Sequence, residues 1–229
     1  MTKIPAAEAV VVIRTVGERT LVACMGLLAS ECADVRIVQA PPVGVMPRTD
    51  ARWLVTIDAD HLPRRGAVAR LLELAERKDA VKVEGRTADN LLGVRRGGLT
   101  VFDMAAVSLD REDHRTVGYV ASDEITTAHD HEQFLVDVFR KGLWYAHKHA
   151  SQMREWLPQW QARGRAGDLD CRVACMGAAA AAQVLGVPDV RVYEPIARLA
   201  LSRAGLHERA PLVMPGPSFE DVETLIGAI

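Results

Sequence analysis

The triplet Asp58-Ala59-Asp60 follows an apolar run, 53–57, and offers two carboxylates to one site. Alternate residues of an extended segment point the same way, so both side chains can face a common ligand. Carboxylate oxygens suit Mg²⁺ or Mn²⁺, and such an ion can neutralise the charge of a departing phosphate group. The same pattern is also typical of a solvated turn. Its meaning therefore depends on the elements that hold it.

The first half of the chain alternates strand and helix signals. Apolar or β-branched runs predict strands at 10–13, 35–38, 53–57, 80–83 and 98–102. Helical periodicity predicts helices from Thr20 to residue 28 and over 67–77, whereas 85–96 is polar and predicted to be irregular. This order predicts an α/β fold, with a mostly parallel sheet flanked by helices. Because ligands bind beyond the carboxyl ends of parallel strands, Asp58 and Asp60 stand where a ligand site is expected.

The second half reads as mostly helical. Helices are predicted over 130–140, 143–156, 168–185 and 195–203, with a short one beginning at Ser218. Gly142 is predicted to separate the first two. The aromatic segments around Trp144 and Trp156 are expected to pack these helices. We therefore expect an α/β domain over 1–150 and a helical C-terminal extension over 151–229 packed on it.

Composition excludes several classes of protein. The 229-residue chain has a formal net charge of -2, which gives no electrostatic reason to expect nucleic-acid binding. Neither a secretory signal nor an apolar stretch long enough to span a bilayer is apparent, so a soluble cytoplasmic protein is expected. Cys171 and Cys175 lie four residues apart, but no second Cys or His pair has zinc-finger spacing. The four cysteines are expected to be buried free thiols.

Two segments resemble the family 2 glycosyltransferases, which have the GT-A fold. The segment 10–18 resembles their first strand and nucleotide-contacting turn, with Thr15 and Glu18 matching and Val16 and Gly17 departing. The segment 53–60 resembles their metal-binding motif. The family's acidic pair after the second strand is missing, because Val-Gln-Ala-Pro-Pro occupies 38–42.

Two later segments resemble a bacterial branch of that family that builds surface polysaccharides. The segment 95–102 resembles the Gly-rich turn and strand that shape the sugar and acceptor pocket, which implies roles for Arg96, Gly97 and Gly98. The segment 129–134 resembles the family's Glu-Asp-x-Glu motif. Asp130 matches the catalytic base and Glu132 the later acid, whereas His129 replaces the first Glu.

These residues leave alternatives open. Asp130 could instead cap the following helix, and Glu132 could share or take the role of base. His129 could complete the metal shell with Asp58 and Asp60.

The resemblance implies a metal-dependent glycosyltransferase. It would move a sugar from a nucleotide-sugar donor to a glycan or lipid-linked acceptor with inversion, using Mn²⁺ or Mg²⁺. The implied nucleotide-sugar contacts are Thr15, Glu18, Asp58, Arg96, Gly97 and Gly98. The C-terminal helices could dock on a dimer partner or on the inner face of the membrane.

Two other functions compete with this one. The first is a catalytically silent protein of the same fold that binds a nucleotide-sugar or a partner enzyme. The second is sugar nucleotidyl transfer, against which the single Gly17 counts, because that class opens with a Gly-rich phosphate loop.

Overall fold

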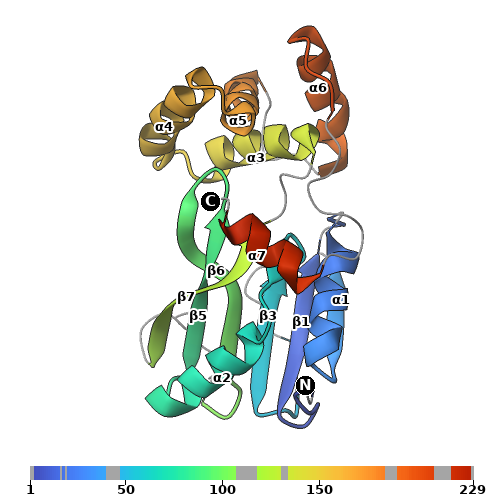
Figure 1. Ribbon diagram of the computed structural model, residues 1–229, viewed down its shortest axis with the longest axis vertical. Coiled ribbons are helices and arrows are strands. Elements are labelled where there is room, and N and C mark those ends of the chain that lie inside the picture. Colours follow the sequence, from blue (N-terminus) through green and yellow to red (C-terminus); the bar gives the residue numbers. More distant parts are fainter. Residues whose placement is uncertain are drawn as a thin grey trace. The chain divides into compact units, whose positions relative to one another are not determined.

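A seven-stranded sheet organises the first part of the chain (Figure 1). The computed structural model describes residues 3–15, 17–18, 20–39, 47–106, 118–129, 134–183, 190–208 and 218–227. The strands are β1 (Ala9–Thr15), β2 (Val35–Gln39), β3 (Trp53–Asp58), β4 (His61–Pro63), β5 (Lys82–Asp89), β6 (Gly93–Asp103) and β7 (Tyr119–His129). Their order across the sheet is β2-β1-β3-β6-β5-β7-β4.

The described chain forms two compact units. Unit 1 holds the described residues up to Asp89, those from Gly93 to His129, and the last helix, α7 (Phe219–Gly227). Unit 2 holds Asn90–Leu92 and the helices between β7 and α7. This division differs from the predicted one at residue 150, because the first of those helices belongs with unit 2 and α7 returns to unit 1.

An α/β fold is confirmed, but the sheet is less parallel than predicted. Strands β1, β2, β3, β5 and β7 run in one direction, whereas β6 runs antiparallel to both β3 and β5, and β4 runs antiparallel to β7. The difference arises in 85–96, which was predicted to be irregular. There β5 and β6 form a long hairpin, in which Gly93 adopts a φ of 70° that favours glycine. A tight hairpin forces antiparallel pairing.

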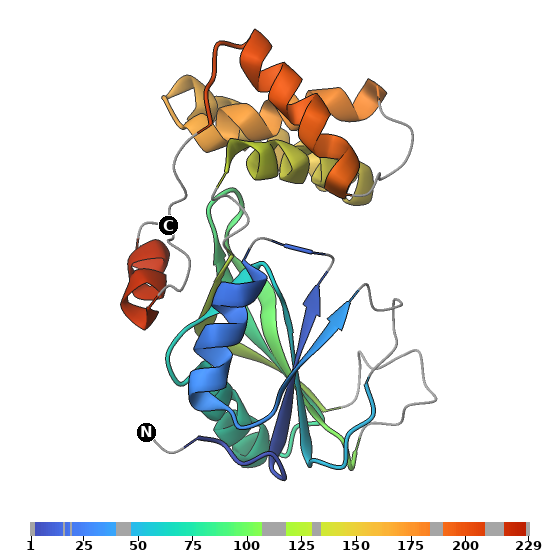
Figure 2. The ribbon, with the colours of Figure 1, turned by 90° about the vertical axis from the view of Figure 1, so that its right-hand side faces the viewer.

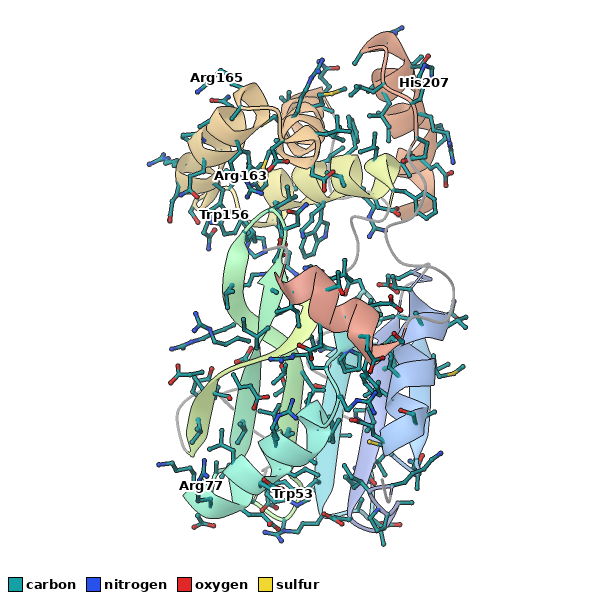
Figure 3. All side chains as sticks on the ribbon, viewed as in Figure 1. Trp53, Arg77, Trp156, Arg163, Arg165 and His207 are labelled. Atoms are coloured by element: carbon teal, nitrogen blue, oxygen red, sulfur yellow. The ribbon has the colours of Figure 1, made fainter. Side chains whose placement is uncertain are left out.

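The helices of unit 1 lie on one side of the sheet. Besides α7 these are α1 (Leu21–Glu31) and α2 (Ala67–Lys78), and the edge-on view of Figure 2 shows all three on the same side. In α2, Val68, Leu71, Leu72 and Ala75 recur at helical spacing and are buried. β1 and β3 are almost wholly buried, as expected for central strands. Trp53, where β3 begins, lies at the end of unit 1 where α2 ends (Figure 3).

Unit 2 is built from helices. They are α3 (Leu135–Lys148), α4 (Met153–Arg165), α5 (Leu169–Ala180), the short 3₁₀ helix η1 (Ala181–Gln183) and α6 (Val190–Arg203). The predicted break at Gly142 is wrong, since α3 runs straight through it. A Cβ at Gly142 or Gly177 would come within 3.0 Å of the α5 or α3 backbone, so these glycines allow the two helices to approach closely.

The α4 helix holds the hairpin tip that belongs to unit 2. Figure 3 shows Trp156 and Arg163 projecting from it. The indole of Trp160 donates to the Leu91 carbonyl at 3.0 Å, and Arg163 donates to the Asn90 carbonyl at 2.8 Å. Of the helices that the structure describes, none is both long and apolar enough to cross a membrane.

Candidate metal centre

The candidate site lies in unit 1, at the carboxyl edge of the sheet. β1, β3, β5 and β7 run in the same direction and end at Thr15, Asp58, Asp89 and His129. The antiparallel strand β4 begins at this edge, where His61 pairs with His129. The topology therefore gathers polar residues from several strands where ligands bind in sheets of this type.

Three side chains converge at this edge: those of Asp60, His61 and His129. Oδ1 of Asp60 lies 2.9 Å from Nδ1 of His61, and Oδ2 of Asp60 lies 3.1 Å from Nε2 of His129. The imidazole rings are stacked, with centroids 4.1 Å apart and an interplanar angle of 11°. One ligand atom from each residue lies within 4.8 Å of the others, which is close enough for all three to hold one metal ion.

Opposing electrostatic effects act on the pKa of Asp60. Burial alone would raise the pKa of Asp60, but His129 and His61 hold that pKa well below its usual range. Both histidines are buried, and Nε2 of His61 has no hydrogen-bond partner among the described residues. A carboxylate between two imidazoles, with one buried ring nitrogen unsatisfied, is a polar cluster that a cation would stabilise.

A second layer of charge supports His129. Oδ2 of Asp89 lies 2.8 Å from Nδ1 of His129, and the Asp89 side chain is fully buried. Nε of Arg95, from β6, donates to the same Asp89 oxygen at 3.1 Å, and Nη2 of Arg95 lies 2.9 Å from Nδ1 of His129. These residues come from three adjacent strands.

Asp58 lies outside this three-residue group. Its Oδ1 accepts from Nε of Arg14 at 2.8 Å, and the two residues are paired in the β1–β3 register. Both side chains are nearly half exposed, 46% for Arg14 and 45% for Asp58, so a ligand could compete for this ion pair. Asp58 as a metal ligand stays a prediction, whereas Asp60 and His129 are brought together.

The turn after β1 holds the predicted pair Thr15 and Glu18. The Thr15 hydroxyl donates to Glu18 at 2.5 Å and accepts from the Gly17 N–H at 2.9 Å. Gly17 has a φ of 98°, which explains why a glycine stands there. Thr20, just beyond, donates its hydroxyl to the carbonyl of Ala59 at 2.7 Å. The turn is thereby tied to the Asp58-Ala59-Asp60 segment.

Gly97 and Gly98 lie on β6 and have φ values of 117° and 86°. A Cβ at Gly98 would overlap the Thr127 hydroxyl and come 3.2 Å from Cδ2 of His61. Gly98 therefore lets β6 approach the candidate ligand His61. Arg96 lies opposite Arg86 in the β5–β6 register. The predicted base Asp130 and the later acid Glu132 lie outside the described residues.

Sequence reasoning missed His61 and Asp89, and it placed Arg95 beside the pocket without connecting it to His129. His61 directly follows the Asp58-Ala59-Asp60 triplet, and this adjacency was a usable signal. The strand that carries it, β4, is only three residues long and gives no periodicity. Asp89 and Arg95 fell in the segment predicted to be irregular, so the hairpin that aims them at His129 was not foreseen.

Comparison with known proteins gives little further guidance. No protein-family model and no curated protein matches the sequence. Among solved structures, the chain is similar to A197 from STIV, with a TM-score of 0.40, 14% identity, and coverage of 53% of this chain and 85% of that one. It is also similar to a glycosyltransferase involved in the glycosylation of the major capsid of PBCV-1, with a TM-score of 0.32, 9% identity, and coverage of 52% and 92%. Both likenesses are too distant to identify a family or an activity.

Proposed function

We propose that this chain is a metal-dependent glycosyltransferase that moves a sugar from a nucleotide-sugar donor to a glycan or lipid-linked acceptor, with inversion. The observation that carries the proposal is the convergence of Asp60, His61 and His129 at the carboxyl edge of the sheet. The same edge carries the turn of Thr15 and Glu18, which resembles the family's nucleotide-contacting turn. A metal centre beside a nucleotide turn is the arrangement that sugar-diphosphate chemistry needs.

The ligand atoms constrain the choice of ion. Asp60 supplies a carboxylate oxygen, and His61 and His129 supply imidazole nitrogens. Mg²⁺ prefers oxygen ligands and keeps several waters, whereas transition metals accept imidazole. Of the two ions expected from the sequence, Mn²⁺ fits this set better. When bound, the ion would neutralise the charge that develops on the departing diphosphate.

The protein's own residues would orient the donor. Asp60, His61 and His129 would hold the ion. Asp58 would become a further ligand once the ion replaced Arg14 as the partner of its carboxylate. Thr15 and Glu18 would contact the nucleotide, and their mutual hydrogen bond already fixes the turn. Gly97 would leave room for the sugar, whereas Gly98 would let β6 approach the metal ligand His61.

The acceptor needs a base. Inversion is a direct displacement at the anomeric carbon, in which a carboxylate takes the proton of the acceptor hydroxyl. Asp130 remains our candidate, with Glu132 as the alternative. Asp130 directly follows the candidate metal ligand His129 in the chain. On this proposal, one metal ligand and the base are neighbours in the chain.

Calorimetry with a panel of UDP-, GDP- and dTDP-linked sugars, with and without Mn²⁺, tests the proposal. We expect one donor to bind only when Mn²⁺ is present, and this binding to be lost in Asp60→Ala and His61→Ala. Asp123→Asn, which changes an exposed acid on β7, is the matched control and should bind normally. Donor binding that ignores both Mn²⁺ and these variants would refute the metal centre.

The same protein can then be assayed for transfer. Metal-dependent donor binding would favour the catalytically silent protein if the chain neither transferred the sugar to a glycan or lipid-linked acceptor nor hydrolysed the donor. Loss of transfer with retained donor binding in Asp130→Ala, but not in Glu132→Ala, is the result expected for the base.

A further inference from the structure

Asp89 is a buried carboxylate that the proposed mechanism does not use. It ends β5, and the parallel β5–β7 register places it beside His129. Its side chain is fully buried, and a buried carboxylate is costly unless it is paired. Its Oδ2 atom lies 2.8 Å from Nδ1 of His129 and 3.1 Å from Nε of Arg95, and both residues belong to the site.

The position of one proton decides whether His129 can bind a metal. A neutral imidazole carries one N–H, and only the other nitrogen has a lone pair for an ion. Nε2 of His129 faces Asp60, so it is the nitrogen that must be unprotonated. Nδ1 must then carry the proton and needs an acceptor.

The two neighbours of Nδ1 favour opposite tautomers. Asp89 can only accept a hydrogen bond from Nδ1, at 2.8 Å, whereas Arg95 can only donate one, at 2.9 Å. If Arg95 donated to Nδ1, the proton of a neutral His129 would lie on Nε2 and block the ion. Arg95 has a second role available, because its Nε donates to Asp89. When Asp89 accepts from both groups, the proton of a neutral His129 lies on Nδ1, and Nε2 is unprotonated with its lone pair available to an ion.

We propose that Asp89 is a positioning residue that fixes the Nδ1–H tautomer of His129, so that Nε2 is presented to the metal, with Arg95 anchoring Asp89. This inference rests on the metal centre of the proposed function. Carboxylates behind a histidine ligand orient the ring and raise its basicity, and losing one weakens metal binding about 10–100-fold.

The first test is calorimetric titration of the full chain with Mn²⁺ alone. We expect Asp89→Asn to weaken binding about 10–100-fold. His129→Ala sets the scale for complete loss of a ligand. Glu84→Gln is the matched control, since it removes the same charge from β5 at a partly exposed position hydrogen-bonded to Tyr119. It should leave the Mn²⁺ affinity unchanged.

The second test uses the wild-type chain and does not depend on a variant that folds. Long-range ¹H–¹⁵N correlation of the His129 imidazole in the Zn²⁺-loaded protein identifies the protonated nitrogen. We expect a proton on Nδ1 and coordination through Nε2. A proton on Nε2, or coordination through Nδ1, overturns the inference.

The outcomes separate the two proposals. If the wild-type chain binds neither Mn²⁺ nor Zn²⁺, the metal centre of the proposed function falls, and the role of Asp89 falls with it. If it binds an ion and Asp89→Asn binds that ion equally well, only the positioning role is overturned.

Discussion

Two adjacent glycines on β6 allow one steric contact to be measured by itself. Gly97 and Gly98 both have positive φ, so alanine at either position carries backbone strain of about 1–2 kcal/mol. They differ in the space around them. Among the described residues, a Cβ at Gly97 would meet only an Arg95 nitrogen at 3.4 Å, whereas one at Gly98 would overlap the Thr127 hydroxyl.

The difference between the two variants follows from that contact. Overpacking a buried site costs about 1–3 kcal/mol, and this cost applies to Gly98→Ala alone. We therefore expect Gly97→Ala to destabilise unit 1 by about 1–2 kcal/mol and Gly98→Ala by about 2–5 kcal/mol. The affinity for Mn²⁺ should fall only in Gly98→Ala, because the new methyl group also presses on His61.

Thr127 supplies an internal check. Its hydroxyl is buried without a hydrogen-bond partner among the described residues, so removing that hydroxyl in Thr127→Ala should cost little. The double variant Gly98→Ala/Thr127→Ala should then recover about 1–2 kcal/mol, as expected for two residues in contact.

Hydrogen exchange of the β3 and β6 amides is the assay, since it reports the opening free energy of unit 1 separately from that of unit 2. Equal losses in Gly97→Ala and Gly98→Ala, or no coupling between Gly98→Ala and Thr127→Ala, would refute the steric reasoning.

Three further predictions concern unit 2. Gly177→Ala should lower the unfolding midpoint in urea by the equivalent of about 1–3 kcal/mol, because its Cβ meets the Phe139 carbonyl; Gly26→Ala, whose Cβ has no described atom within 4 Å, should not. Partial burial raises the pKa of Asp168, but the Cys171 N–H and Arg163 hold it below its usual value; the stabilisation is therefore present above the unfolded pKa of about 3.9 and is lost as the pH falls through the lower folded pKa. The destabilisation caused by Asp168→Ala, about 1 kcal/mol at neutral pH, should accordingly shrink in acid titrations followed by circular dichroism. A thiol reagent counted by mass spectrometry should modify Cys175 first, since the other three cysteines are buried; earlier labelling of Cys24 would contradict this.

The sequence pattern predicted the part of the site whose residues are neighbours in the chain. A buried run ending in Asp58-Ala59-Asp60 could be recognised as a strand with a ligand end, because both signals lie within eight residues, 53–60. The hairpin of β5 and β6 was missed because 84–97 contains no apolar run of strand length: buried and partly exposed residues alternate in β5 as far as Thr87, and 93–98 of β6 includes no buried residue. The partnership of Asp60 with His129 was foreseen only through the family resemblance.

The rest of the site depends on strand register. Asp89 meets His129 because β5 and β7 pair in parallel, and His61 meets His129 because β4 pairs with β7. Such pairings join residues far apart in the chain, and side-chain periodicity in one strand does not determine them. The tautomer of His129 is harder still to predict from the sequence, since it depends on Asp89 and Arg95, which come from different strands.

The return of α7 to unit 1 has a consequence for how the protein is made. α7 packs against β7 and β4, its Val222 is fully buried, and Glu223 accepts from both Nε and Nη2 of Arg64 at 2.7 Å. Arg64 directly follows β4, the strand that begins with His61. During synthesis β4 therefore lacks its contact with α7 until residues 218–227 have left the ribosome. The Arg64–Glu223 ion pair accordingly forms only after the helices of unit 2 have been translated.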